Sequence, residues 1–162
     1  MKSMIEIREA ADGEILGASI FQRRYGQNPP KLLHHVMAFH RVSPFAEVPV
    51  CYVHFTPAGK ILFGGGACVD DRMIRRMPLT VRNSIRVNGG LYQMTLTWAL
   101  RHFAPTYSAI FGYCGDALAE RIDLAVGFQR TSHAHLLVYW LRDLPADECE
   151  RLIAQAHAIG PF

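Results

Sequence analysis

The sequence predicts a mixed α/β (α+β) domain in which an antiparallel meander of strands precedes alternating helices and strands. Two observations lead to this prediction. Apolar runs joined by short turns fill the segment from residue 32 to residue 69. Beyond residue 90 the apolar residues recur every three to four positions, which is the period of a helix. We therefore expect a mixed central sheet with helices on both of its faces.

The composition is that of a folded protein. The chain has 162 residues, of which 50% are hydrophobic and 10% aromatic, and this suits one domain over residues 1–162. The formal net charge of +3 is too small to indicate nucleic acid or a membrane surface by itself. The four cysteines form no C-x-x-C pair, which favours buried thiols in a cytoplasmic protein. No apolar run suits a membrane span, so no membrane partner is expected.

Strands dominate the first half of the expected order. Residues 14–21 are expected as a short strand or an extended segment, and strands are predicted at residues 32–42, 50–55 and 61–69. Loops are expected at 26–30 and 43–49, because both segments contain prolines. The basic stretch from Arg72 to Ser84 is interrupted by Pro78, which predicts a loop or a broken helix.

Helices alternate with strands in the second half. The run 91–103 has apolar residues three, four and seven positions apart and predicts a buried helix. Asp116 is expected to cap a second helix that Gly127 ends, and Pro145 and Gly160 bound a third. The strands expected here cover residues 107–113, 128–131 and 133–141.

Two glycines precede the buried helix, in the segment Arg86-Val87-Asn88-Gly89-Gly90-Leu91. The first N–H groups of a helix lack internal acceptors and face any anion placed there. Arg86 would add a planar donor for phosphate. The alternative is an ordinary junction between a loop and a helix, because short glycine motifs are weak evidence.

The order of elements, together with this turn, resembles the GNAT (GCN5-related N-acyltransferase) superfamily, of which the chain would be a divergent member. That family has a Q/R-x-x-G-x-G/A turn whose amides bind the pyrophosphate of acyl-coenzyme A. Arg86, Gly89 and Leu91 stand at the three motif positions, and Leu91 departs from the usual Gly or Ala. The cofactor-binding residues that the resemblance implies are Cys68, Val69, Arg86, Val87, Asn88, Gly89, Gly90, Leu91 and Asp116.

The segment 115–128 is the second part of the resemblance. Gly127 and Phe128 match a Gly-Phe of the family, and Asp116 stands at the position of an Asn. Asp123 stands where a family Tyr often protonates the leaving thiolate, and Tyr113 or a water could take that role instead. The two helices that begin the family's fold are not evident, and the loops at 26–30 and 43–49 are expected in their place.

Candidate bases lie on the expected strands. His54 could take a proton from a substrate amine, because the pKa of imidazole lies near neutral pH. The alternative is a hydrogen-bonded residue of the sheet. Asp70 could act as the base at the end of a strand or could simply close a turn. His54, His133 and His135 could together bind a metal, but no ligand spacing supports this and no metal is expected.

Three functions remain open on the sequence. In the first, an amine attacks acetyl-CoA or another acyl-CoA directly, which makes the protein an acyl-CoA-dependent N-acyltransferase. The second is a DNA-modifying protein similar to the phage Mom proteins, with the basic segment from Arg72 to Arg86 contacting nucleic acid. The third is a GNAT-like binding module without activity, for example a homodimer, which the departures at Leu91 and Asp123 would favour.

Overall fold

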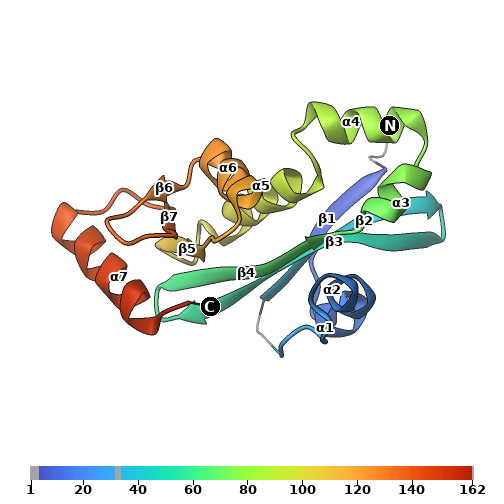
Figure 1. Ribbon diagram of the computed structural model, residues 1–162. Helices are drawn as coiled ribbons and strands as arrows, with labels where there is room; N and C mark the ends of the chain where they lie inside the picture. Colours follow the sequence, from blue (N-terminus) through green and yellow to red (C-terminus); the bar gives the residue numbers. More distant parts are fainter. Residues whose placement is uncertain (1–3, 32–33, 162) are drawn as a thin grey trace. The chain divides into compact units, whose positions relative to one another are not determined.

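The computed structural model describes residues 4–31 and 34–161. Within these residues, seven strands form one mixed sheet in the order β1-β2-β3-β4-β5-β7-β6 (Figure 1). The strands are β1 (Ile5–Glu9), β2 (His34–Ser43), β3 (Ala46–Ala58), β4 (Ile61–Val69), β5 (Ala109–Tyr113), β6 (Gln129–Arg130) and β7 (Leu136–Trp140). The helices are α1 (Gly13–Leu16), α2 (Ala18–Tyr25), α3 (Asp71–Arg76), α4 (Leu79–Val87), α5 (Leu91–Phe103), α6 (Ala117–Val126) and α7 (Ala146–Ile159). The expected fold class is confirmed.

The N-terminal segment differs from its prediction. Residues 14–21 were expected as a short strand or an extended segment, and this was wrong, because all but Gly17 belong to the helices α1 and α2. Helix α2 has only eight residues and buries only Ile20 and Phe21, so its apolar stripe is too short to show a helical period. These are the two N-terminal helices that the sequence did not reveal. Strand β1, which pairs antiparallel with β2, was also not predicted.

The meander and the later helices follow the sequence closely. Strand β4 and the helices α5 and α6 have the bounds that their apolar patterns predicted. Strand β3 is longer than expected, since it begins at Ala46 inside the segment 43–49 that was expected as a loop. The basic stretch is a broken helix, with Met77 and Pro78 between α3 and α4. Strand β7 begins only at Leu136, so the prediction that residues 133–135 belong to a strand was wrong.

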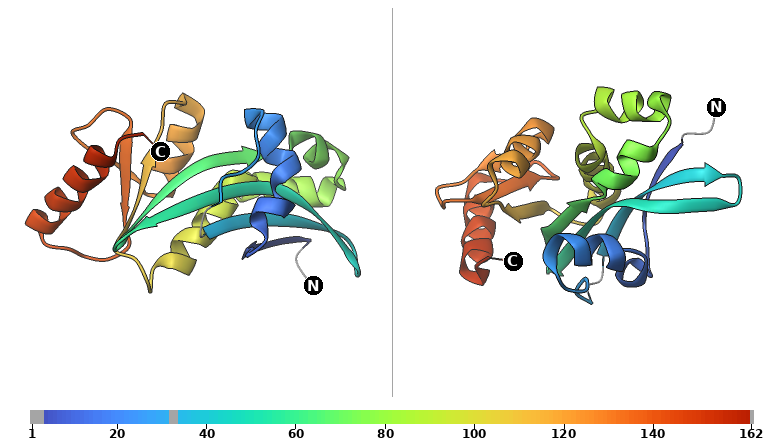
Figure 2. Two further views of the ribbon diagram at one scale, coloured as in Figure 1. Left: turned by 90° about the horizontal axis from the view of Figure 1, so that it is seen from below. Right: turned by 45° about the vertical axis from the view of Figure 1, so that its right-hand side comes forward.

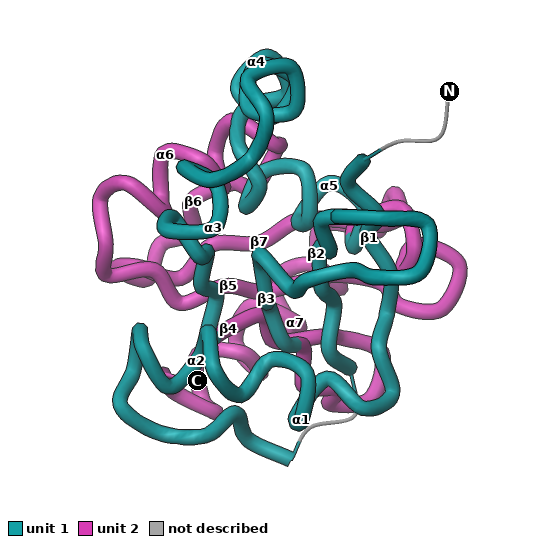
Figure 3. The backbone as a smooth tube through the Cα atoms, turned by 90° about the vertical axis from the view of Figure 1, so that its right-hand side faces the viewer, with its two compact units in different colours: residues 1–54, 66–99 teal, residues 55–65, 100–162 magenta. Residues whose placement is uncertain are grey.

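The chain forms two compact units, drawn in two colours in Figure 3. Unit 1 comprises residues 1–54 and 66–99, and unit 2 comprises residues 55–65 and 100–162. In unit 1, α1 and α2 lie on one face of the strands and α3 and α4 on the other (Figures 1 and 2). None of the described helices is long and apolar enough to cross a bilayer.

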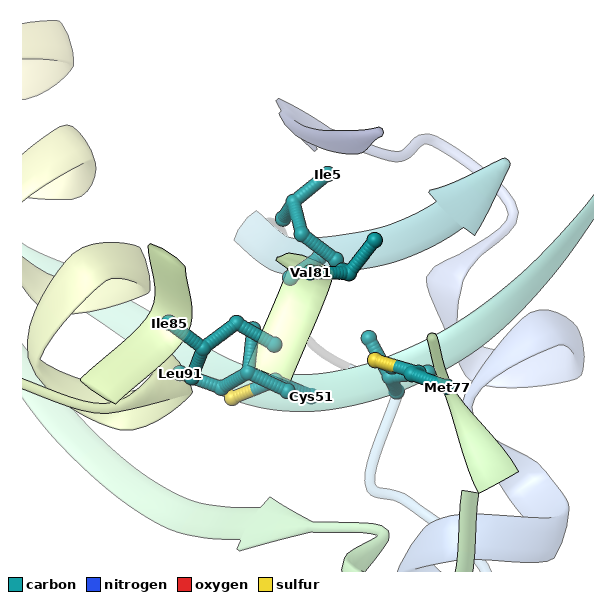
Figure 4. Close-up of a cluster of buried hydrophobic side chains, with 8 residues drawn as sticks. Ile5, Cys51, Met77, Val81, Ile85 and Leu91 are labelled. Atoms are coloured by element: carbon teal, nitrogen blue, oxygen red, sulfur yellow. The ribbon is translucent and has the colours of Figure 1, made fainter. Parts of the chain in front are cut away.

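Apolar side chains hold each unit together. Beneath α3 and α4, the residues Met77, Val81 and Ile85 pack against the strands together with Leu91 of α5 (Figure 4). On the opposite face of unit 1, α2 contributes Ile20 and Phe21 to a second cluster that also contains polar groups. In unit 2 a third cluster joins β4, β5 and β7 to α7. Burial of these surfaces is the main force that fixes the elements.

Candidate functional site

Strand β4 continues beyond its pairing with β5. The parallel register joins four residue pairs, from Ile61–Ala109 to Gly64–Gly112, whereas β4 runs on to Val69. Gly66 has a φ of 60°, which breaks the regular strand conformation and which side chains rarely adopt. In a strand, successive N–H groups point to opposite neighbours. The described part of β4 after Gly64 therefore has backbone groups with no register partner on β5.

The predicted residues at the end of β4 lie together in unit 1. Cys68 is buried, and burial raises the pKa of its thiol to about 12, so the group stays protonated at neutral pH. Asp70 is buried as well, and its carboxylate accepts hydrogen bonds from Arg23 (2.5 Å) and from the N–H of Met73 (3.3 Å). The second bond caps α3. These bonds favour the interpretation of Asp70 as a residue that closes the strand.

Helix α2 is attached to the end of β4 by polar contacts. The Tyr25 hydroxyl donates a hydrogen bond to the carbonyl oxygen of Ala67 (2.7 Å). Arg23, two residues before Tyr25 on the same helix, forms the ion pair with Asp70. Phe21, one turn earlier, contacts the position where a side chain at Gly66 would begin. These three contacts place α2 directly over the irregular part of β4.

Three buried polar rings lie on the same face of unit 1. His35 of β2 shares a hydrogen bond of 2.7 Å between its Nδ1 and the hydroxyl of Tyr52. The same hydroxyl lies 3.4 Å from Nδ1 of His54, two residues further along β3. Burial, and secondarily the nearby His35, lowers the pKa of His54 to about 4. His54 is therefore a neutral imidazole at neutral pH, as a base requires.

The two glycines before α5 have a different environment from the one expected. The N–H of Gly89 donates to the carbonyl of Arg86 (3.1 Å), and the N–H of Gly90 donates to that of Ile85 (2.9 Å). With Gly89 at a φ of 86°, these bonds form a Schellman motif that ends α4. The N–H of Asn88 also has an acceptor within α4. The expectation that the amides of Asn88, Gly89 and Gly90 are open to a diphosphate was therefore wrong.

The first turn of α5 retains donors. The first helical bond runs from Met94 to Gly90, so the N–H groups of Leu91 and Gln93 precede the internal hydrogen bonds of the helix. The amide end of the Gln93 side chain lies against Gly89, where an added Cβ would overlap it. Arg86 and Val87 are exposed on the last turn of α4. Any anion at this turn would meet the amides of α5 and the Arg86 guanidinium.

The predicted residues of unit 2 lie around α6. Asp116 caps this helix by accepting from the N–H of Leu118 (3.1 Å), and Tyr113 is the half-buried last residue of β5. Asp123 is buried, and one of its carboxylate oxygens lies 4.0 Å from where a Cβ on Gly112 would be. Burial, and secondarily the charge of Asp123, raises the pKa of the Cys114 thiol. The structure thus places Asp123 and Tyr113 near the end of one strand.

Metal ligands are not grouped in the described part of the chain. No set of three or more His, Cys, Asp or Glu side chains there could hold an ion. His133 and His135 belong to the loop before β7, and His133 stacks on His157 of α7 with ring centroids 3.6 Å apart. The hypothesis of a metal bound by these residues has no support.

Some residues of the site were missed by the sequence analysis. These are Arg23 and Tyr25 on α2, His35 and Tyr52 in the ring network, and Gln93 on α5. A signal existed for Tyr52, because residues two apart on a strand share a face and Tyr52 precedes His54 by two. No comparable signal existed for α2, since its partners lie more than forty residues away.

Comparison with known proteins identifies the fold. No family model and no curated protein matches the sequence. Among solved structures, N-acetylglutamate synthase from Neisseria gonorrhoeae, complexed with coenzyme A and L-arginine, matches 88% of this chain with a TM-score of 0.59 and 15% identity. The ribosomal-protein-S18-alanine N-acetyltransferase from Escherichia coli matches 89% of this chain and 98% of its own, with a TM-score of 0.59 and 9% identity.

A third solved structure belongs to the GNAT family. A GNAT-family structure from Desulfovibrio desulfuricans matches 85% of this chain and 99% of its own, with a TM-score of 0.57 and 12% identity. The chain spans only 34% of the length of the N. gonorrhoeae synthase, and only 45% of the length of a matched structure from Pyrococcus horikoshii. The architecture is therefore the fold that these solved structures share. More narrowly, the protein has the GNAT fold, in a divergent form.

Proposed function

We propose that the protein is an acyl-CoA-dependent N-acyltransferase that transfers an acyl group to an amine. The observation that carries the proposal is that β4, in a GNAT fold, continues past its pairing with β5. The N–H of Asp70 donates to Val50 of β3, so the preceding N–H, that of Val69, points away from β3 and would stabilise the oxyanion that forms as the amine attacks the thioester. A GNAT-fold relative was crystallised with coenzyme A, which supports acetyl-CoA or another acyl-CoA as the donor.

The transfer is proposed to be direct. An acyl-cysteine intermediate would need a thiolate, and the raised pKa of Cys68 keeps this thiol protonated. The amine nitrogen would form its bond to the carbonyl carbon as the bond to sulfur breaks. His54 would accept the amine proton, and Asp123 or Tyr113 would protonate the leaving thiolate. Positioning of the reactants and backbone hydrogen bonds to the oxyanion would supply most of the rate enhancement.

The coenzyme is proposed to place its pyrophosphate at the first turn of α5. The Leu91 and Gln93 amides and the Arg86 guanidinium are the donors that remain there once the Schellman motif is formed. The helix dipole would add to the attraction for an anion. Asp116, which caps the next helix, is the remaining residue that the family resemblance assigns to coenzyme binding.

A change of Gln93 to Glu tests this placement without straining the backbone. A carboxylate in the first turn suits the helix dipole, so the stability of the protein should be kept. The same carboxylate would repel the pyrophosphate, and we expect the calorimetric Kd for acetyl-CoA to rise at least about tenfold, which corresponds to about 1.4 kcal/mol. The matched control is Gln129→Glu on the exposed strand β6, which should leave the Kd unchanged.

Two results would contradict the proposal at different levels. Equal Kd values for both variants would move the pyrophosphate away from α5 and leave acyl transfer standing. No binding of acetyl-CoA to the wild-type protein at millimolar concentration would remove the acyltransferase function. A stable homodimer without coenzyme affinity would then favour the inactive binding module.

A nucleic-acid partner is the second candidate, and the charge distribution favours it. The helices α3 and α4 carry five exposed arginines and a single acid, Asp71. The formal net charge of the whole chain is only +3, so the rest of the chain is slightly acidic. None of the ion pairs among the described residues includes Arg76 or Arg82. The five arginines are Arg72, Arg75, Arg76, Arg82 and Arg86.

Helix α4, the longer of the two, has nine residues, which at about 1.5 Å per residue is a length of about 14 Å. That length faces several phosphates of a duplex, which presents one charge per about 1.7 Å. Backbone contacts of this kind would bind nucleic acid without selecting its sequence. In the DNA-modifying alternative, this surface would hold the strand whose base is altered.

The double variant Arg76→Gln/Arg82→Gln tests this surface while leaving Arg86 for the coenzyme. We expect weaker retention of a labelled duplex at low salt, and a slope of log Kd against log salt that is shallower by about two. The control Arg101→Gln/Arg121→Gln removes the same charge from exposed positions on α5 and α6. Equal losses in both double variants would reduce the effect to net charge and reject the surface.

A further inference from the structure

Burying the polar rings of His35, Tyr52 and His54 costs free energy of folding. The three side chains are at most 9% exposed, and no charged group is among the bonded partners of Tyr52. Apolar residues surround them, including Phe21, whose ring centroid lies 5.5 Å from that of Tyr52 and 6.0 Å from that of His54. Polar groups buried in this way destabilise a protein unless their hydrogen bonds are made. A chemical role would explain their presence.

The distances assign a direction to the two hydrogen bonds. Tyr52 has one hydroxyl proton, and burial raises its pKa above the usual range, so the hydroxyl stays a donor. The separation of 2.7 Å from His35 is typical of an O–H donor, whereas 3.4 Å from His54 suits a weaker N–H donor. Tyr52 therefore donates to Nδ1 of His35 and accepts from Nδ1 of His54. This leaves the lone pair of His54 on Nε2.

The edge of the His54 ring that carries Cε1 and Nδ1 faces β4 at Gly66. Its Cε1 atom, which lies between the two ring nitrogens, occupies the space that a Cβ on Gly66 would fill. Nε2 is not among the buried unsatisfied atoms of the described residues, and the hydrogen bond described for this ring uses Nδ1. A glycine with a φ of 60° is thus what lets the imidazole approach the strand. Two residues further along that strand is Cys68.

We propose that Tyr52 and His35 are positioning residues that hold His54 as the Nδ1–H tautomer, so that its Nε2 accepts a proton from the attacking amine. This inference rests on the proposed acyl transfer. The amine nitrogen bonds to the thioester carbon, the carbon–sulfur bond breaks, and the sulfur leaves as a thiolate. The N–H proton passes to Nε2 and from there to water. A neutral imidazole is restored after each turnover.

The low basicity of His54 defines what it can do. Because its pKa is about 4, it cannot deprotonate an ammonium ion to any extent at neutral pH. It can accept the proton of an amine that is already neutral, since that proton becomes strongly acidic as the carbon–nitrogen bond forms. The imidazolium then releases its proton rapidly. The fixed tautomer matters because the Nε2–H form would present a donor to the amine in place of a lone pair.

The first measurement is independent of catalysis. Nitrogen-15 NMR of histidine-labelled protein should show His54 protonated on Nδ1 and unprotonated on Nε2. In Tyr52→Phe, the acceptor of that Nδ1 proton is lost, and the His54 signals should move toward the Nε2–H tautomer. The control His40→Gln removes another buried histidine of β2 that has no bond to Tyr52, and it should leave the His54 signals in place.

The second measurement is turnover of acetyl-CoA with benzylamine as the probe amine. We expect His54→Gln to lower kcat about 100-fold or more, as loss of a general base does. Tyr52→Phe and His35→Gln should lower kcat about 10-fold, with the KM for acetyl-CoA unchanged. A wild-type His54 in the Nε2–H tautomer, or an unchanged tautomer in Tyr52→Phe, would overturn the inference. Failure of acetyl-CoA to bind the wild type would instead remove the proposed function itself, and the catalytic role of His54 with it.

Discussion

The two apolar clusters beneath α7 and beneath α2 differ in what they bury. The buried members of the cluster of unit 2 are all apolar, among them Phe111 and Leu136, which are both fully buried. The cluster of unit 1 beneath α2 surrounds an imidazole–phenol–imidazole network and a thiol. Burial of apolar side chains stabilises a fold, whereas buried polar groups lose their hydrogen bonds to water and destabilise it unless bonds within the protein replace them. The difference indicates that the cluster beneath α7 serves mainly to hold the fold, whereas the α2 face of unit 1 buries polar groups that packing alone does not explain.

The largest expected effect is a loss of packing in unit 2. The Phe111 ring lies edge-on to Trp140 with centroids 6.1 Å apart and is completely buried. Phe111→Ala should lower the free energy of unfolding by about 3–5 kcal/mol, measured by urea denaturation. The control is Phe45→Ala, because Phe45 is 99% exposed and its removal should leave the denaturation midpoint in place. A small effect at Phe111 would contradict the stabilising role assigned to this cluster.

A smaller effect is expected from acid on the polar cluster. The pKa of His54 is about 4 in the folded protein and about 6.5 in the unfolded chain, so the unfolded chain binds more protons between these values. The neutral His54 makes its full contribution to the free energy of unfolding above about pH 6.5. This contribution decreases by about 3 kcal/mol in total as the pH falls to 4. When the free energy of unfolding is measured from pH 7 to pH 4, it should decline less steeply for His54→Gln than for the wild-type protein. Parallel curves for the two proteins would show that His54 is not the group responsible.

The smallest effect is the difference in cost between the same substitution at two glycines, which have the same φ of 60°. Gly59 has no atom within 4 Å of where a Cβ would be, whereas at Gly66 a Cβ would overlap the His54 and Phe21 rings. Gly59→Ala should cost about 1–2 kcal/mol from backbone conformation alone. Gly66→Ala should cost a further amount of about 1–3 kcal/mol, because the rings must move. Equal costs by urea denaturation would mean that the ring of His54 is not held against β4.

The candidate site was predicted unevenly. Cys68, Asp70 and His54 were located from strands with a strong β pattern, and the structure brings all three into unit 1. The turn before α5 was located as well, but the role of its glycines was not, because a Schellman motif and an anion-binding turn use the same residue type. Which carbonyl accepts each amide depends on whether a helix precedes the turn. Here α4 does precede it.

The amino-acid sequence by itself determined the elements whose signals are local and long. The helices α5 and α6 and the strand β4 have the predicted bounds, because apolar periods, an Asp cap and terminal glycines all act within a few residues. Only the tertiary structure decided which distant groups meet. The hydrogen bond between His35 and Tyr52 depends on how β2 and β3 are aligned, and the ion pair between Arg23 and Asp70 depends on where α2 lies on the sheet. Such contacts follow from the packing of whole surfaces, which no short stretch of sequence encodes.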